Sequence, residues 1–351
     1  MLARHARPAT QLFLPAALLA LAIAPAACAQ SCAGDLNGDG VIDGADLGQL
    51  LAAWGPCESC AADVNANGVV DGADLGVQVG NWGECVTIPA WATVVEAQPN
   101  PDVVTDPALR AAIAATGLAW RVRDTATQVE MLLVPPGTFL MGCVMGSDAF
   151  GCFAPEQPVH QVTLTNAFYI GRYEVTQAQW RARMGSNPSS YQGSTRPVDS
   201  VSWNLIQGFL SATGLRLPTE AEWEFACRAG TQTPFYNGST VDAGVAELAW
   251  CTLNTCSGSS GCGSREVGLK AANGFGIHDM LGNVWEWVND WNGGYTNEAQ
   301  TNPTGPSNAS TRVIRGGGWN VDSHAVRSSF RGYGTPGGSG TGIGFRVART
   351  P

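Results

Sequence analysis

The clearest chemical pattern lies in a tandem repeat near the start of the chain. DLNGDGVIDGADLGQLLAAWG, from Asp35, superposes on DVNANGVVDGADLGVQVGNWG, from Asp63, after a shift of 28 residues. Counted from each first Asp, oxygen-bearing side chains stand at positions 1, 3, 5, 9 and 12, with glycine at position 6. A hard cation prefers about six to eight oxygen ligands that converge from one short segment. This spacing therefore predicts a calcium loop in each repeat.

The two loops would supply equivalent ligands. In the first loop the predicted ligands are Asp35, Asn37, Asp39, the Val41 carbonyl, Asp43 and Asp46; in the second they are Asp63, Asn65, Asn67, the Val69 carbonyl, Asp71 and Asp74. The second loop has one carboxylate fewer, so we expect it to bind calcium more weakly. The alternative is a pair of Asx-rich turns without metal.

The last ligand of each loop is Asp rather than a bidentate Glu, and the residues that follow it predict one helix per repeat. From Asp35 to Gly83 the sequence resembles a type I dockerin, whose loops are of the EF-hand type. The resemblance implies a protein-binding module that docks onto a cohesin-like partner. Residues 30–86 carry nine acidic side chains and no Lys or Arg, so we expect this module to be loose without a cation and to order when calcium binds.

A second set of motifs begins near Val129 and follows a fixed order. It comprises VPPGTFLMG, EQPVHQVTL, YEVTQAQW, PVDSVSWN, RLPTEAEWEFACRAG, NGFGIHDMLGNVWEWVNDW, RVIRGGGWN and GFRVAR. From Val129 to Arg349 the chain resembles the formylglycine-generating enzyme family, also called the sulfatase-modifying-factor domain. The resemblance implies an α+β, C-type-lectin-related fold with little regular secondary structure, over residues 126–351.

The resemblance also locates the catalytic centre of that family. Its motif carries GGS, an aromatic residue, one further residue, a cysteine and a second cysteine five places later, and the thiol pair binds Cu(I) and activates oxygen. In this chain the serine position is Gly318 and the cysteine positions are Val321 and Val326. Valine offers no lone pair to a metal, so we expect no copper and assign no catalytic residue.

Iron is not expected either. A branch of the superfamily holds nonheme iron with three histidines, whereas His160, His278 and His324 are far apart in this sequence. Relatives in pyoverdine maturation lack the cysteine pair, which leaves a cysteine-independent oxidative tailoring enzyme as the alternative. In such an enzyme Asp322 and His324 could form an acid/base pair.

We predict instead a binding or scaffolding role for the large domain. The residues expected to line its ligand cleft are Trp319, Asp322, His324, Arg327 and Arg331. A peptide or a glycan would occupy this cleft, and the two arginines could clamp carboxylates.

The family resemblance further implies a structural calcium ion. Its ligands would be Asp279, the carbonyls of Gly282 and Val284, and Glu286. The alternative is that Glu286 pairs with a buried arginine.

The elements that must position these residues can be predicted in outline. VEMLLVPPGTFLMG reads as a strand, a proline turn and a second strand that together form a hairpin. Thr176 is the expected N-cap of one helix, VSWNLIQGFLSATG forms a second that ends at Gly214, and Thr219 with Glu222 predicts a capping box for a third. Glu220, Glu222 and Glu224 are expected in structural hydrogen bonds. Residues 87–125 contain four prolines and one short helix candidate and read as a linker.

The first 29 residues predict a secretory signal. Arg4 and Arg7 precede an apolar run that two prolines interrupt, and Ala29 is the expected cleavage point. We therefore expect a secreted protein, extracellular or periplasmic, without a transmembrane segment. The net charge of −10 argues against nucleic acid as a partner.

Removal of the signal leaves ten of the 11 cysteines, an even number suited to disulfides. The simplest pairing closes each repeat, Cys32 with Cys57 and Cys60 with Cys85, and Cys57 with Cys60 is the alternative. Cys143 with Cys152 would close a short loop in the large domain.

Overall fold

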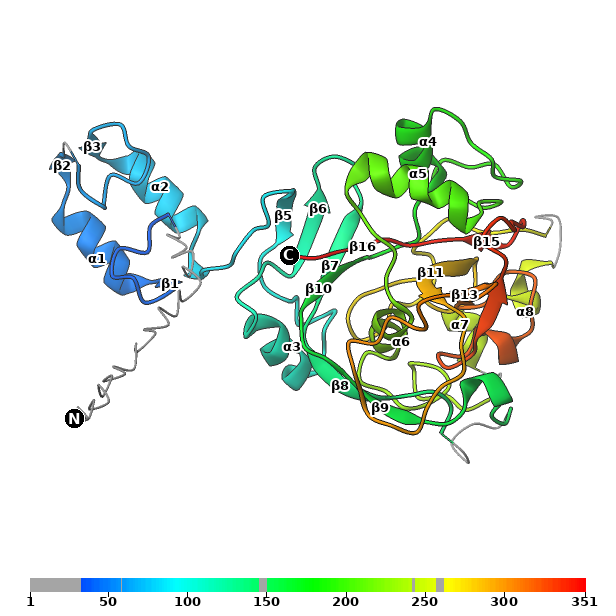
Figure 1. Ribbon diagram of the computed structural model, residues 1–351. Coiled ribbons are helices and arrows are strands. Elements are labelled where there is room, and N and C mark those ends of the chain that lie inside the picture. Colours follow the sequence, from blue (N-terminus) through cyan, green and yellow to red (C-terminus); the bar gives the residue numbers. More distant parts are fainter. Residues whose placement is uncertain (1–32, 58, 145–149, 242–243, 257–261) are drawn as a thin grey trace, which may run out of the picture. The chain divides into compact units, whose positions relative to one another are not determined.

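The computed structural model describes residues 33–57, 59–144, 150–241, 244–256 and 262–351. The predicted secretory signal, residues 1–29, and Cys32 lie outside the described residues. The chain divides into two compact units, Met1–Cys85 and Val86–Pro351 (Figure 1).

The first unit is built from the two repeats. Its helices are α1 (Gly44–Ala52) and α2 (Gly72–Gly80), and its short strands are β1 (Val41–Ile42), β2 (Gly55–Pro56), β3 (Val69–Val70) and β4 (Gly83–Glu84). Strands β1 and β3 lie in the first and second loop, and β2 and β4 follow the first and second helix. Each loop strand pairs with the strand after the helix of the other repeat, β1 with β4 and β3 with β2. The two repeats therefore hold each other in place around a small core of Leu50, Ala62 and Val70.

One disulfide expectation for this unit is wrong. Cys57 bonds to Cys60, three residues away, so Cys57 cannot also bond to Cys32 and Cys60 cannot bond to Cys85. Cys57 and Cys60 follow β2 on the short connection into the second loop, where their Cα atoms lie 5.9 Å apart. The alternative pairing, Cys57 with Cys60, is the one that the fold adopts.

The second unit combines three sheets with several short helices. The strands run in the orders β16-β10-β7-β6-β5, β14-β13-β11-β15 and β12-β9-β8. They are β5 (Ala92–Glu96), β6 (Arg121–Asp124), β7 (Glu130–Val134), β8 (Gly137–Met141), β9 (His160–Leu164), β10 (Phe168–Gly171), β11 (Trp285–Trp291), β12 (Gln300–Thr301), β13 (Arg312–Arg315), β14 (Gly332–Gly334), β15 (Ile343–Gly344) and β16 (Ala348–Arg349). The mixture of helix and sheet confirms the α+β prediction.

The helices of this unit are short. They are α3 (Pro107–Ala114), α4 (Gln177–Met184), α5 (Trp203–Thr213), α6 (Glu220–Arg228), α7 (Val245–Leu248) and α8 (Thr252–Thr255), with 3-10 turns η1 (Ala154–Glu156) and η4 (Ser323–Val326). Helix α6 lies at the centre of the unit and packs against β8, β11 and β13 (Figure 1). It links the sheets through one core whose four fully buried indoles are those of Trp120, Trp180, Trp223 and Trp287.

The predicted linker, residues 87–125, is instead part of the second unit. Strands β5 and β6 form one edge of the five-stranded sheet, where β6 pairs with β7. Trp120 and Val122 are buried in the core, and the Asp124 carboxylate accepts from Arg349 at 2.6 Å. Pro89, Pro99 and Pro101 lie between elements and Pro107 is the first residue of α3, so these prolines mark turns and a helix start and not an extended spacer. The predicted helix within it is confirmed as α3.

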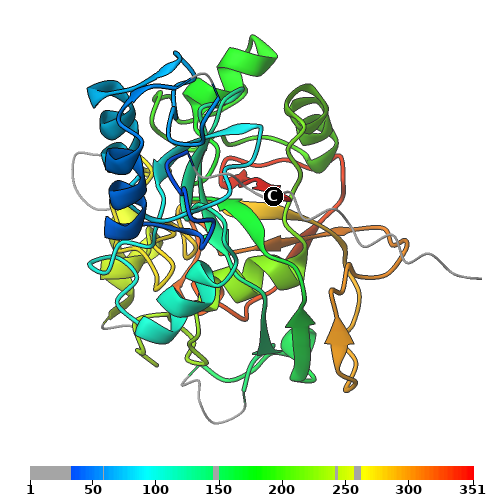
Figure 2. The same cartoon turned by 90° about the vertical axis from the view of Figure 1, so that its left-hand side faces the viewer.

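The expected hairpin at VEMLLVPPGTFLMG is also wrong, although both strands exist. β7 pairs with β10 and β6, whereas β8 pairs with β9 in another sheet. The two prolines between them carry the chain from one sheet to the next. Figure 2 shows β8 and β9, in green, beside the orange strand β12, which pairs with β9 in parallel.

The predicted helix starts are confirmed. Thr176 caps α4, Thr219 and Glu222 form the capping box of α6, and α5 ends at Gly214 in the left-handed conformation that glycine adopts most readily. Among the described residues, no helix combines the length and apolar character that a membrane span requires.

Candidate functional site

The positions that carry the cysteine pair in the formylglycine motif are part of the packed interior. Val326 is fully buried in the main core, and Val321 is half-buried against the same core. Gly317 adopts a φ of +74°, and a Cβ added there would lie 2.6 Å from Cγ1 of Val326. The glycine run therefore lets the backbone pass directly over Val326, and both positions present aliphatic carbon only.

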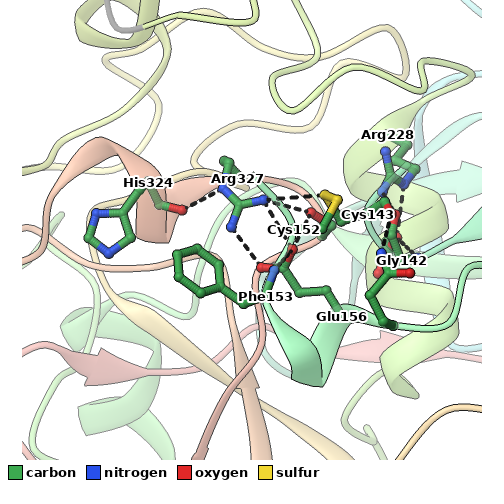
Figure 3. Close-up of a disulfide and its surroundings, with 11 residues drawn as sticks. Gly142, Cys143, Cys152, Phe153, Glu156, Arg228, His324 and Arg327 are labelled. Carbon is green, nitrogen blue, oxygen red and sulfur yellow. Dashed lines mark hydrogen bonds and ion pairs between the residues drawn. A yellow bond between two sulfur atoms is a disulfide. The ribbon is translucent and has the colours of Figure 1, made fainter. Parts of the chain in front are cut away.

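The predicted ligand cleft does not assemble, because its arginines hold the fold together. Arg327 is fully buried, and its guanidinium donates to both carboxylate oxygens of Glu156 at 2.7 and 3.1 Å (Figure 3). Arg331 makes a two-point pair with Glu220 at 2.6 and 2.8 Å. A buried guanidinium needs such a partner, so neither arginine is available to clamp a ligand carboxylate. This part of the prediction is corrected.

The other predicted cleft residues have separate surroundings. The Trp319 indole donates to the Thr341 carbonyl at 3.1 Å, and the exposed Asp322 carboxylate accepts from the Thr252 hydroxyl at 2.8 Å. The half-buried His324 ring lies against Phe153 and Phe330, with ring centroids 6.1 and 5.9 Å away. Asp322 and His324 thus bond to different neighbours, and the expected acid/base pair is not formed.

The predicted disulfide between Cys143 and Cys152 is present and lies beside Arg327. Figure 3 shows this disulfide next to Arg327 and Glu156, where Cys152 directly precedes Phe153, the N-cap of η1. The two sulfur atoms and the Glu156 carboxylate lie within 4.8 Å of one another. Because the sulfurs are bonded to each other, this group serves as a crosslink and not as a set of thiolate ligands.

The remaining described cysteines of this unit are either disulfide-bonded or, like Cys251, fully buried. Cys256 bonds to Cys262. Cys227 is a buried thiol that donates to the Ser328 hydroxyl at 3.5 Å, and burial raises its pKa to about 12. A thiol with so high a pKa is almost entirely protonated at neutral pH and is a poor nucleophile.

Of the predicted calcium ligands of the second unit, Glu286 is held by a buried arginine, and one buried oxygen of Asp279 has no hydrogen-bond partner among the described residues. Glu286 accepts from Arg346 through both oxygens at 2.7 to 2.9 Å, and from the Trp223 indole at 2.7 Å. Its carboxylate is already surrounded by donors, which confirms the arginine alternative. Asp279 accepts from the Gly268 amide at 2.6 Å, and burial raises its pKa.

The three glutamates of α6 have the structural roles that the sequence predicted. Glu220 pairs with Arg331, Glu222 with Arg216, and Glu224 with Arg228 at 2.8 Å and with Arg315. Their arginine partners lie up to 111 residues away along the chain. The sequence identified the acids but not the partners.

In the first unit, the predicted loop ligands do converge. Oxygens of Asp35, Asp39 and Asp46 lie within 4.8 Å of one another. Asp46 is fully buried and accepts from the amides of Leu36, Asn37 and Asp43 at 2.8, 3.1 and 3.0 Å. Burial would raise the pKa of Asp46, but these amides outweigh it, so the pKa lies below its usual value. A clustered set of hard oxygens of this kind fits a calcium ion.

The second loop repeats this geometry. Asp74 is fully buried and accepts from the Asn65 and Asp71 amides at 3.0 and 2.9 Å. These amide bonds lower its pKa, as in the first loop. Asp63 accepts from the Asn67 and Gly68 amides at 3.0 and 2.7 Å. The two loops therefore share one backbone conformation.

Comparison with known proteins decides the family of the second unit. Residues 119–351 match the sulfatase-modifying factor enzyme 1-like domain. The chain belongs to this family. The matched region contains the motifs from Val129 to Arg349 as well as the last residues of the segment that was expected to be a linker.

Curated relatives of this sulfatase-modifying-factor-like chain differ in activity. The formylglycine-generating enzyme of Mus musculus is 33% identical over 202 residues, 54% of this chain and 53% of that protein. The chaperone protein LppX of Paenibacillus barcinonensis is 30% identical over 295 residues, 69% of this chain and 97% of LppX. The inactive C-alpha-formylglycine-generating enzyme 2 of Mus musculus is 30% identical over 194 residues, 50% of this chain and 56% of that protein. The chain thus spans about half the length of the two mouse proteins.

Solved structures support the same fold. PvdO from Pseudomonas aeruginosa has a TM-score of 0.54 at 29% identity and covers 66% of this chain and 98% of its own. Treponema denticola variable protein 1 has a TM-score of 0.56 at 27% identity, with 64% of this chain and 95% of its own covered.

Proposed function

We propose that this chain is a secreted, calcium-binding protein whose sulfatase-modifying-factor-like domain binds a peptide or glycan and does not make formylglycine. The observation that carries the proposal is the pair Val321 and Val326 at the positions of the two copper-binding cysteines. A thiolate pair suits Cu(I), and two aliphatic side chains cannot replace it. The inactive mouse relative and the chaperone protein LppX support a role other than catalysis.

Calcium belongs to the N-terminal module in this proposal. The ligands would be the side-chain oxygens of the two loops, together with the carbonyls of Val41 and Val69. The ion would neutralise carboxylates that otherwise repel one another, so the module would become more ordered when calcium binds. The disulfides Cys57–Cys60, Cys143–Cys152 and Cys256–Cys262 support an oxidising compartment, in keeping with secretion.

The same module would dock onto a cohesin-like protein partner. Leu51 and Trp54 of the first repeat are 52% and 50% exposed, and Val79 and Trp82 occupy the equivalent positions of the second at 54% and 51%. Half-exposed indoles are frequent anchors of protein interfaces. We expect W54A/W82A to weaken binding to a recombinant cohesin domain at least tenfold in calorimetric titration, with retained calcium binding as the folding control. Equal binding by the variant would remove this docking role.

Elemental analysis of the purified mature chain tests the noncatalytic assignment. After exhaustive dialysis we expect calcium without stoichiometric copper or iron, and no oxygen uptake when copper and a cysteine-containing peptide are added. Stoichiometric copper or iron, together with oxygen uptake, would instead establish the alternative, an oxidative tailoring enzyme. The variant V321C/V326C is the matched comparison, because it restores only the two sulfur atoms. We expect it to retain Cu(I) that the natural chain does not.

A further inference from the structure

A cavity of about 360 Å³ lies next to the N-terminus of α6. Residues of β8, β9, the start of α6, the end of β11 and the segment 293–306 line it. Neither Val321 nor Val326 is among its lining residues, so it is separate from the cysteine positions of the formylglycine motif. Thr304 and Pro306 at its edge are exposed to solvent. Its size is at the lower end of the range for ligand pockets and suits a small group.

The cation in the lining of this cavity cannot receive an anionic ligand. Arg331 uses Nε and Nη2 to hold Glu220, and Nη1 donates to the carbonyls of Pro155 and Gly293 at 2.9 Å each. Almost all of its five N–H donors are therefore engaged within the fold. A phosphate or carboxylate entering the cavity would meet the acids Glu220 and Asp290 without a free positive partner.

The polar groups that remain free are acceptors. Asp290 is 3% exposed, and one of its oxygens accepts from the Glu220 amide at 2.9 Å, while the other, Oδ1, has no partner among the described residues. His160 Nδ1 lies 3.1 Å from the Pro158 carbonyl and donates to it, and in the neutral ring Nε2 is then an acceptor. The Gln300 amide donates to the Thr296 hydroxyl at 3.0 Å, which leaves its oxygen as a third acceptor.

Part of the lining is apolar. It includes Met141, Ala221, Pro303 and Pro306. Guanidinium groups already lie against the nearby rings, since Arg331 lies 4.1 Å from the Tyr295 ring centre and Arg312 lies 3.6 Å from that of Trp291. An alkyl stem can pack against the prolines and the methionine.

We propose that this cavity binds an organic cation, an ammonium or guanidinium group on an alkyl stem, as in a lysine or arginine side chain. The inference rests on the proposed binding function and names its ligand class. The N–H groups of the cation would donate to Asp290 Oδ1, His160 Nε2 and the Gln300 oxygen. A bound cation would favour the ionised form of Asp290, whose carboxyl group lacks a cation of its own within hydrogen-bonding distance among the described residues. The net charge of −10 would attract such ligands over longer distances.

Calorimetric titration of the full chain tests this proposal with four probes. These are butylammonium, N-acetyl-lysine methylamide, N-acetyl-arginine methylamide and, as the opposite charge on the same stem, butyrate. We expect at least one cationic probe to bind and butyrate not to bind. Tighter binding of the two peptide-like probes than of butylammonium would identify a peptide as the source of the cation, and the reverse would identify a free amine.

Two variants make the test specific to the cavity. D290N keeps an oxygen for the Glu220 amide but removes the charge. We expect it to lower the affinity for the cationic probe at least tenfold. D102N removes an exposed carboxylate elsewhere on the same unit and should leave binding unchanged. Equal binding by D290N, or binding of butyrate in place of the cations, would overturn the proposal.

Failure here can be told apart from failure of the proposed function. A chain that binds no cationic probe but holds no copper or iron and consumes no oxygen loses only the cavity assignment. Retention of copper with oxygen uptake contradicts the noncatalytic role itself, whatever the cavity binds.

Discussion

At the scale of single residues, buried acids decide the stability of the large domain. Glu224 is fully buried and is held by Arg228, by Arg315 and by the Gly142 amide at 2.9 Å. Burial would raise the pKa of Glu224, but the two arginines and the amide outweigh this, so the pKa lies below its usual value. The carboxylate is thus ionised at neutral pH and balances the charge of two buried guanidinium groups.

We expect E224A to destabilise the protein by about 3 to 5 kcal/mol, because it leaves two buried cations without their partner. E298A, at an exposed position of the same unit, should change stability by no more than about 0.5 kcal/mol. Urea unfolding followed by tryptophan fluorescence measures both. If E224A lowers the free energy of unfolding by less than about 1 kcal/mol, water reaches Glu224 and its two arginines, and these ion pairs are not buried in solution.

Asp290 behaves in the opposite way. Burial, reinforced by the negative charge of Glu220, raises the pKa of Asp290 to about 8. An ordinary Asp has a pKa of about 3.9 when unfolded, so between about pH 4 and 8 the folded chain binds a proton that the unfolded chain does not. Stability therefore decreases as the pH rises through this range, and the loss is complete above pH 8.

The comparison of the natural chain with D290N isolates this effect. Asn cannot ionise, so the stability difference between the variant and the natural chain should shift in favour of D290N by more than about 1.4 kcal/mol from pH 5 to pH 8.5, the value of one pKa unit. Urea unfolding at several pH values measures it. If the unfolding free energies of the two proteins change with pH in parallel, Asp290 titrates normally and is solvated.

The sequence predicted which residues stand at the motif positions, but not what surrounds them. Gly318, Val321 and Val326 could be assigned from the motif alone because that assignment needs only spacing. The roles of Arg327 and Arg331 could not, since their partners Glu156 and Glu220 lie 171 and 111 residues away in sequence. Whether an arginine is buried in an ion pair depends on such distant partners. A local motif carries no information about those partners.

At the scale of elements, local signals were reliable and pairing was not. The capping residues Thr176 and Thr219 and the helix end at Gly214 follow from hydrogen bonds within a few residues, so they could be read directly. Strand pairing depends on the whole sheet, which is why β7 and β8 were wrongly joined as a hairpin. The segment of residues 87–125 was misread for the same reason, since β5 pairs with β6 and the two join the larger sheet only through the pairing of β6 with β7.

The two predicted calcium loops differ in one ligand, and exchanging that ligand between them gives a test. At position 5 the first loop has Asp39 and the second has Asn67, and the other predicted ligands are of the same type in both loops. We expect calorimetric titration of the full chain to resolve two calcium sites of unequal affinity. D39N should weaken the tighter site until the two are nearly equal, and N67D should tighten the weaker one, because ligand charge tunes the affinity.

Each variant serves as the control for the other, since the two changes are opposite and occupy equivalent positions. A natural chain that takes up no calcium would contradict the metal assignment and leave the Asx-rich turns without an ion. Two sites that both weaken in D39N would contradict only the assignment of the tighter site to the first loop.

At the scale of the whole molecule, the chain contains two cores of very different size. The first unit has a small cluster of Leu50, Ala62 and Val70, whereas the second has a continuous core that includes most of its tryptophans. A unit of about 60 residues buries too little apolar surface to be very stable by itself, so bound ions and disulfides matter more for it. The second unit can be stable without them.

Scanning calorimetry of the full chain should therefore show two unfolding transitions that respond differently to calcium. A ligand bound only to the folded state at 100 times its dissociation constant adds about 2.7 kcal/mol, so calcium should raise the temperature of the smaller transition and EDTA should lower it. The larger transition should stay in place, because Glu286 is engaged by Arg346 and Trp223 and is not available to an ion. If EDTA shifts the larger transition instead, an ion is held in the second unit, and the pairing of Glu286 with Arg346 must give way to calcium when the ion is present.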